Sequence, residues 1–287
     1  MVSKYKYFVD LMRPFTLLSP MVGFLSGALI AVRGFPHWST YMGMISAVVL
    51  NAASNVINQV FDLEIDKINK PHRPLPQAKI TIRAAIIFSI ILYGLSIGLS
   101  FLINLQFFII VVVTAFITYF YSSPPLRFKK RTIISNVAIA ITRGLLLIVA
   151  GWSSVKSIFY LEPWCIGSIF GLYIMGAAST KDFSDIKGDK KYGVNTLPVI
   201  YGIKKTAKFI CPFLVFPFLL IPLGVYLEVI TFHALPLTLL SLWGGYICLL
   251  ILKRPEELSY EVNHISWKHM YSLLLAGQGG FAIAYLI

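Results

Sequence analysis

The sequence predicts an all-α membrane protein, a polytopic bundle of nine transmembrane helices with a cytoplasmic N-terminus. Three observations predict this fold class. The composition is 57% hydrophobic with a mean hydropathy of +0.77, which excludes an ordinary soluble domain. Apolar runs close to the roughly 20 residues that a helix needs to cross a bilayer recur along the whole chain. Basic residues gather in every second break between these runs.

The nine apolar runs are the predicted spans. Lipid offers no hydrogen-bond partner to the backbone, so each run must satisfy its own backbone groups, which favours helices over open strands. Weak alternation argues against a membrane barrel. No linker suggests a second domain, so residues 1–287 are predicted to form a single transmembrane domain. In chain order the predicted spans are 15–33, 40–61, 82–103, 105–122, 133–152, 163–180, 207–227, 232–252 and 268–287.

The basic residues give the predicted orientation. Of the 25 Lys and Arg residues, 22 precede the first span or follow the second, fourth, sixth and eighth, all on one side of the nine-helix arrangement. The positive-inside rule makes that side cytoplasmic, with the C-terminus outside. We therefore expect an integral protein of the cytoplasmic membrane. This topology and attraction to anionic lipid head groups account for the net charge of +13, so no nucleic-acid partner is expected.

Half of the acidic residues are concentrated in two long cytoplasmic breaks, roughly 62–82 and 181–206. Six of the twelve carboxylates fall in two short windows there: Asp62, Glu64 and Asp66, and Asp182, Asp185 and Asp189. Residues three or four apart share one face of a helix. Asn51, Asn55, Asn58, Asp62 and Asp66 are spaced in this way, and so are the three aspartates of the second window. Each window therefore predicts one carboxylate face.

Carboxylates this close repel one another unless a cation lies between them. A structural network of ion pairs with nearby lysines is one interpretation. The other is a site for Mg²⁺, which usually binds through one or two carboxylates together with substrate phosphates. The position of both windows at membrane-proximal helix ends favours the metal–phosphate interpretation.

Basic residues on the same side are candidates for phosphate binding. The stretch from Tyr121 to Lys129 leaves the fourth span and includes Arg127, while Arg73 and Lys181 flank the two acidic windows. Each of these cations, taken alone, is also explained by topology. Arg143 differs because it lies within the fifth span, where a charge is costly and is expected to have a partner or to line a cavity. Together these groups suit a diphosphate with a long apolar tail.

At these residues the chain resembles the UbiA-type intramembrane prenyltransferases. Asn58, Asp62 and Asp66 match the first family motif, Asn-x-x-x-Asp-x-x-x-Asp, and Asp185 and Asp189 match the second, Asp-x-x-x-Asp. Residues 121–129 match the Tyr-Ser-x-Pro-Pro-Leu-x-x-Lys stretch of the family. The agreement in hydropathy and motif placement covers nearly the full length. Gln59 departs from the family pattern, because many members carry a second acid at that position.

The resemblance implies a mechanism and a site. Mg²⁺ ions would bind an isoprenyl diphosphate and neutralise the departing pyrophosphate, and the bundle would shield the allylic cation until an acceptor captures it. The implied catalytic residues are Asp62, Asp66, Asp185 and Asp189. The implied metal ligands are Asn58, Asp62, Asp66, Asp182, Asp185 and Asp189. The residues implied to bind the diphosphate are Arg73, Tyr121, Arg127, Lys129 and Lys181.

The acceptor is less closely defined. Two branches of the family look most similar: the archaeal enzymes that prenylate geranylgeranylglyceryl phosphate, which we favour, and the chlorophyll synthases. Enzymes that prenylate aromatic quinone precursors look less similar around Arg73. Outside this family, a cation-coupled secondary transporter is an alternative, although its ionisable groups are expected near the bilayer midplane. A non-catalytic membrane scaffold gives no reason for two carboxylate faces, and the sequence indicates no oligomeric state.

Overall fold

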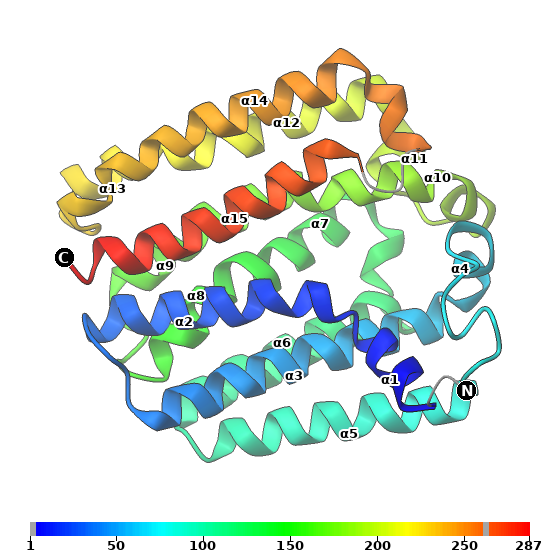
Figure 1. Ribbon diagram of the computed structural model, residues 1–287, viewed down its shortest axis with the longest axis horizontal. Coiled ribbons are helices and arrows are strands. Elements are labelled where there is room, and N and C mark those ends of the chain that lie inside the picture. Colours follow the sequence, from blue (N-terminus) through cyan, green and yellow to red (C-terminus); the bar gives the residue numbers. More distant parts are fainter. Residues whose placement is uncertain (1–3, 261–263) are drawn as a thin grey trace.

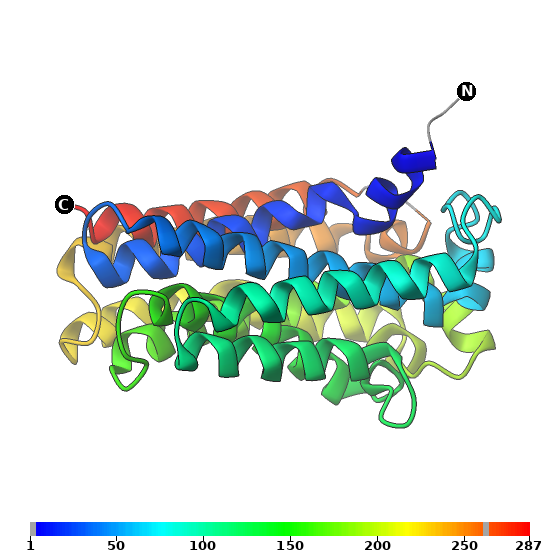
Figure 2. The same ribbon diagram turned by 90° about the horizontal axis from the view of Figure 1, so that it is seen from below.

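The protein is a bundle of long helices whose axes lie roughly alongside one another (Figure 1). The computed structural model describes residues 4–260 and 264–287, and every regular element in those ranges is a helix. The first described helix and the short helices α4, α10 and α11 gather at one end of the bundle, and the C-terminus lies at the other (Figures 1 and 2). The all-α membrane bundle predicted from the sequence is confirmed.

The helices are numbered in chain order. The α-helices are α1 (Lys4–Met12), α2 (Leu18–Val32), α3 (Trp38–Phe61), α4 (Leu63–Asn69), α5 (Ile82–Phe101), α6 (Leu105–Ser122), α7 (Thr132–Ala140), α8 (Leu146–Ser153), α9 (Leu161–Ala177), α10 (Asp182–Lys191), α11 (Leu197–Tyr201), α12 (Ile203–Leu219), α13 (Ile221–Tyr226), α14 (Leu240–Lys253) and α15 (Ile265–Ala284). The 3₁₀ turns are η1 (Pro14–Leu17), η2 (Phe128–Lys130), η4 (Ala178–Lys181), η5 (Phe232–Leu239) and η6 (Pro255–Ser259), and η3 (Ile141–Leu145) is a π-helical turn.

Eight helical stretches of the described chain are long and apolar enough to cross a membrane, and they fall on the first eight predicted spans. They are Pro14–Val32, Trp38–Phe61, Ile82–Phe101, Leu105–Ser122, Thr132–Ser153, Leu161–Lys191, Ile203–Tyr226 and Phe232–Lys253. Helix α15 covers the ninth predicted span and runs along the bundle (Figure 1), but it carries polar residues such as Lys268 and Gln278. The count of nine spans therefore stays a prediction.

The second acidic window lies in a helix, in line with the shared helical face predicted for its three aspartates. Helices α9 and α10 are joined through η4, and the helical stretch ends only at Lys191. Asp182 and Asp185 stand in the first turn of α10, and Lys190 and Lys191 stand in its last. That order of charges complements the helix dipole, and Gly193, at φ 65°, follows the helix where an αL residue commonly ends one.

The first acidic window is also mostly helical, because α4 starts directly after α3. Asp62 separates the two helices with φ −100° and ψ 10°. The amide of Asp62 still donates to the carbonyl of Asn58 at 2.9 Å, and the amide of Asp66 donates to the carbonyl of Asp62 at 2.7 Å. The four-residue register predicted for Asn58, Asp62 and Asp66 therefore continues across the junction.

Small residues allow α2 and α8 to cross at close range. A Cβ atom added to Gly27 would overlap the carbonyl oxygen of Ile148, and one added to Gly151 would overlap that of Phe24. Such backbone approach is typical of packed membrane helices, which gain stability from close van der Waals contact. The crossing holds α8 against α2, and the preceding turn η3 packs against α9, where a Cβ atom added to Gly144 would overlap the backbone of Gly171.

Candidate active site

Asp62, the first acid of the first window, is held in a polar pocket between α3, α6 and the loop that follows α6. The side-chain nitrogen Nδ2 of Asn58 donates to Asp62 Oδ2 and to Ser122 Oγ, each at 2.8 Å. Lys129 forms an ion pair with Asp62, and only 7% of its side chain is exposed. The Nδ2 bonds turn Asn58 so that its Oδ1 is left as an acceptor, which suits the metal-ligand role predicted for it.

Asp66 lies one helical turn further along and is almost fully buried. Its Oδ2 accepts a hydrogen bond of 2.6 Å from Arg73 Nη1, and the two side chains are 5% and 15% exposed, respectively. Glu64, between the two aspartates, points away and pairs with Lys67 on the surface, where its side chain is 57% exposed. The structure thus separates Glu64 from the two acids that the motif singles out.

Helix α4 joins the two acidic windows directly. The side chain of Asn69 donates to the carbonyl of Asp185 at 2.9 Å and accepts from the amide of Gly188 at the same distance. Lys70 forms an ion pair with Asp185. Sequence reasoning missed Asn69, Lys70 and Gly188, although Lys70 lies four residues after Asp66.

Asp182 and Asp189 complete the second window. Asp189 is buried, with 7% of the residue exposed, and Asp182 is half-buried. Tyr121, near the end of α6, interacts electrostatically with Asp182, Asp189 and Arg143. The predicted substrate-binding tyrosine is therefore close enough to the second acidic window and to Arg143 to interact with both.

The loop after α6 brings two predicted phosphate-binding cations to the first window. Arg127, at φ 40°, donates from Nη2 to the carbonyl of Phe61 at 3.3 Å, next to Asp62. Burial lowers the pKa of Arg127 and lowers the pKa of Lys129 to about 8, although Asp189 and Asp185 favour the charged form of Lys129. Both cations are thus held where water screens them poorly.

The acidic side chains are paired with lysine and arginine side chains and do not form one cluster of carboxylates. In the part of the chain that the structure describes, no three His, Cys, Asp or Glu side chains lie together closely enough to hold a metal ion. The donors are all carboxylate or amide oxygens, the ligands that Mg²⁺ prefers. Asp62, Asp66 and Asp185 each have one cationic partner. The set of oxygen donors is therefore of the kind that Mg²⁺ binds.

A cavity of about 1000 Å³ lies within the bundle next to this site. Most of its lining is apolar and comes from α2, α3, α6, α8, α9 and α15, including Leu50, Phe107 and Leu274. Lys181, adjacent to Asp182, also lines the cavity, and its side chain is exposed. Lys181, the cation predicted to bind the diphosphate at the second acidic window, is therefore also part of the cavity wall.

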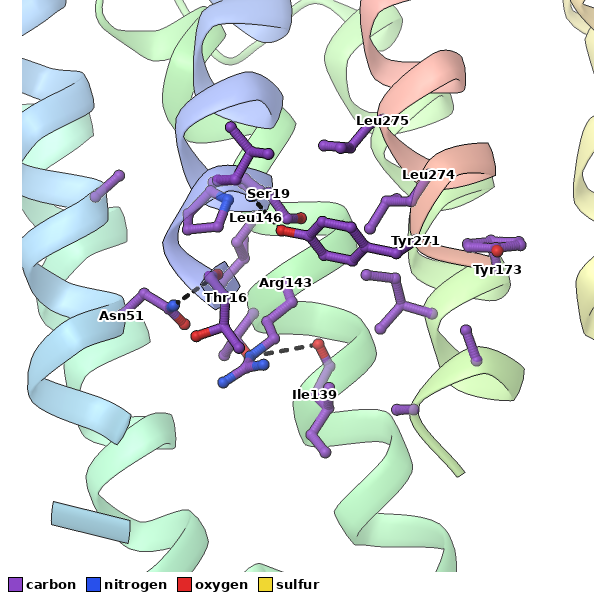
Figure 3. Close-up of a pocket in the computed structure, with 18 of the residues that line it drawn as sticks. Thr16, Ser19, Asn51, Ile139, Arg143, Leu146, Tyr173, Tyr271, Leu274 and Leu275 are labelled. Atoms are coloured by element: carbon purple, nitrogen blue, oxygen red, sulfur yellow. Dashed lines mark hydrogen bonds between the residues drawn. The ribbon is translucent and has the colours of Figure 1, made fainter. Parts of the chain in front are cut away.

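Polar side chains mark the part of the cavity shown in Figure 3. Asn51 Nδ2 donates to the carbonyl of Thr16 at 3.2 Å, and the backbone amide of Ser19 donates to the hydroxyl of Tyr271 at 3.1 Å. Arg143, from the π-helical turn η3, lies among these residues and lines the cavity, as expected of a charge within a span.

The asparagines before Asp62 have structural partners. Asn55 Nδ2 donates to the carbonyl of Met12 at 2.8 Å and to Thr16 Oγ1 at 2.9 Å. Together with Asn51, it attaches η1 to α3. Asn55 is buried, and Asn51 lines the cavity.

Comparison with known proteins identifies the family and the fold of the chain. Digeranylgeranylglyceryl phosphate synthase of Methanosphaera stadtmanae is 29% identical over 97% of this chain and 99% of its own length. A solved structure described as a digeranylgeranylglyceryl phosphate synthase is 31% identical, covers 99% of both chains and has a TM-score of 0.74. A UbiA homologue from Archaeoglobus fulgidus, solved with GPP and Mg²⁺, shares the fold at 21% identity with a TM-score of 0.79, covering 98% of this chain and 99% of its own. Residues 20–262 match the UbiA prenyltransferase family, and the chain belongs to that family.

Proposed function

We propose that this membrane prenyltransferase transfers a geranylgeranyl group from its diphosphate to the free hydroxyl of geranylgeranylglyceryl phosphate and releases pyrophosphate. One observation carries the proposal. Helices α4 and α10 bring the two acidic windows together beside a large apolar cavity that Lys181 also lines. The charged diphosphate would bind at the acidic windows, and the long apolar tail would lie in the adjoining cavity. The names of the similar synthases support this choice of acceptor over a chlorin or an aromatic ring.

The proposed site has two sets of residues. Asp62, Asp66, Asp185 and Asp189 are the proposed catalytic acids, and with Asn58 and Asp182 they would hold Mg²⁺. When bound, Mg²⁺ would supply Lewis-acid stabilisation of the charge that develops on the leaving pyrophosphate. Arg73, Tyr121, Arg127, Lys129 and Lys181 are the proposed diphosphate-binding residues.

The ion pairs explain how the chain's own residues would act. Arg73 and Lys129 lie beside Asp66 and Asp62, where Mg²⁺ would bind. In the complex their side chains would turn to the phosphate oxygens. The bond between prenyl C1 and the diphosphate oxygen breaks, and its electron pair leaves with the pyrophosphate. A new bond forms between C1 and the acceptor oxygen, whose hydroxyl proton passes to solvent. The apolar walls of the cavity exclude water, which would otherwise capture the cation.

The location of the reaction follows from the charge distribution. The acidic windows lie at the same end of the bundle as α1 and the basic breaks after the second, fourth and sixth spans. By the positive-inside rule, we propose that this end faces the cytoplasm and that the protein lies in the cell membrane. A diphosphate made in the cytoplasm would then reach the site without crossing the bilayer.

The test is an assay of purified protein with geranylgeranyl diphosphate, Mg²⁺ and a panel of lipid, chlorin and aromatic acceptors, with products identified by mass. We expect a product from geranylgeranylglyceryl phosphate, pyrophosphate in equal amount, and loss of both when EDTA is present. Addition of Mg²⁺ in excess should restore them. A product from only a chlorin or an aromatic acceptor would contradict the proposed acceptor, and no product from any would contradict the substrate assignment.

A further inference from the structure

Arg143 is a charged residue in the membrane span Thr132–Ser153 that neither acidic window uses. The π-helical turn η3 presents it to the cavity, where its side chain lies near Thr16 and Asn51 (Figure 3). A single π-helical turn within an α-helix is frequently found at a functional site. The position is buried among apolar segments, so a charge there is costly unless it has a partner.

The partners of Arg143 within the described residues are neutral. Its Nη2 donates a long hydrogen bond of 3.4 Å to Asn55 Oδ1, and its charge interacts with the hydroxyls of Tyr121 and Tyr271. No acidic residue of the described chain lines the cavity, whereas Arg143, Lys181 and Lys268 all do. The cavity is thus a cationic space without a counter-ion of its own.

Three cations of the acidic windows differ in this respect. Lys70, Arg73 and Lys129 each have a carboxylate partner. A donor diphosphate and its metal ions would rearrange those pairs among themselves. Arg143 would remain unpaired on the cavity side, so the charge balance leaves room for a second anion.

We propose that Arg143 binds the phosphate of the acceptor lipid and so selects a phosphorylated acceptor over its uncharged alcohol. The inference rests on the proposed function, in which the acceptor carries a phosphate beside the hydroxyl that is prenylated. A guanidinium forms charge-assisted, bidentate bonds readily with a phosphate, and Arg143 presents one to the cavity beside the polar residues Thr16 and Tyr271. The ether-linked chain of the acceptor lies along the apolar part of the cavity.

The experiment compares the intact protein with Arg143→Gln and Arg143→Lys. For each, steady-state constants are measured with geranylgeranylglyceryl phosphate and with dephosphorylated geranylgeranylglycerol, at saturating donor and Mg²⁺. Binding of the phosphorylated acceptor is measured separately by calorimetry without donor. Lys253→Gln, at the exposed end of α14 and outside the cavity lining, is the control for loss of one positive charge.

We expect Arg143→Gln to raise the KM for the phosphorylated acceptor about 10-fold or more, because a guanidinium–phosphate bond is charge-assisted. Arg143→Lys should raise the same KM by less, since it keeps the positive charge. The KM for the donor and the constants for the dephosphorylated acceptor should stay unchanged. If Arg143→Gln keeps the preference for phosphate, or weakens donor binding equally, the inference is wrong.

The calorimetric arm separates this inference from the proposed function. If Arg143→Gln weakens acceptor binding while the intact protein shows no turnover, the proposed function is contradicted and the phosphate site is supported. Equal binding by the intact protein and both variants would overturn the phosphate site. If Arg143→Gln does not fold, Arg143→Lys still tests the inference. This variant keeps the charge but loses the bidentate geometry, so it should weaken binding of the phosphorylated acceptor to a smaller extent.

Discussion

At the scale of single residues, neighbouring acids of one short helix have opposite environments. Asp66 is 5% exposed at its side chain and bound to Arg73, whereas Glu64, two residues away, is 57% exposed and paired with Lys67 at the surface. A solvated pair contributes little, because water and salt screen it. A buried pair matters more, since removal of one partner leaves the other charge without compensation.

This contrast gives a matched pair of substitutions. Asp66→Asn keeps the shape of the side chain but removes a charged oxygen ligand, so we expect kcat to fall roughly 100-fold or more, the scale seen when an electrostatic catalytic contact is lost. Glu64→Gln should change kcat less than about twofold. Pyrophosphate release is the measurement, and equal rates in the two variants would remove Asp66 from the proposed site.

At the scale of elements, the site depends on the contact between α4 and α10. Asn69 spans the gap with one bond to the Asp185 carbonyl and one to the Gly188 amide. Gly188 has to be small there: an added Cβ atom would lie 2.6 Å from Asn69 Nδ2 and 2.7 Å from Asn69 Oδ1. Glycine at this position therefore sets the separation of the two carboxylate faces.

Gly188→Ala tests that contact. We expect the variant to unfold at lower temperature, consistent with an overpacking cost of about 1–3 kcal/mol, and to need a higher Mg²⁺ concentration for half-maximal activity because the two faces move apart. Gly98→Ala is the control, since nothing lies within 4 Å of a Cβ atom at Gly98. An unchanged Mg²⁺ requirement in Gly188→Ala would show that the two faces do not act together.

At the scale of the whole molecule, the bundle leaves a cavity that several helices share. Helices α3 and α6 both end near the acidic windows, so Phe107, in the first turn of α6, lines the far end of the cavity. Ala150 of α8 lines it as well and is buried. We expect the depth of this space to limit the length of the prenyl chain that the protein accepts.

Ala150→Leu should shorten the cavity. We expect kcat/KM for geranylgeranyl diphosphate to fall about 10-fold relative to that for geranyl diphosphate, because one or more methylene groups lose their place in an apolar pocket. Ala276→Leu makes the same change on an exposed part of α15 outside the cavity lining. A similar fall for both donors, or the same result in Ala276→Leu, would contradict this role for the cavity floor.

The local pattern of the sequence determined the membrane helices and the two acidic faces. Apolar length and four-residue spacing are properties of neighbouring residues, and backbone hydrogen bonding in lipid allows them few other structures. The first eight spans and the register of Asn58, Asp62 and Asp66 were predictable for that reason. The three- and four-residue spacing of Asp182, Asp185 and Asp189 likewise predicts a helical face, and α10 contains all three.

Only the tertiary structure decided which groups meet. Lys129 reaches Asp62 from the loop after α6, and Asn69 reaches Gly188 across more than a hundred residues of chain. It also decided that Arg143 faces a cavity with no acidic lining residue in the described chain. Such pairings depend on how helices far apart in the sequence pack and on the burial that makes their charges costly, and spacing along one helix records neither.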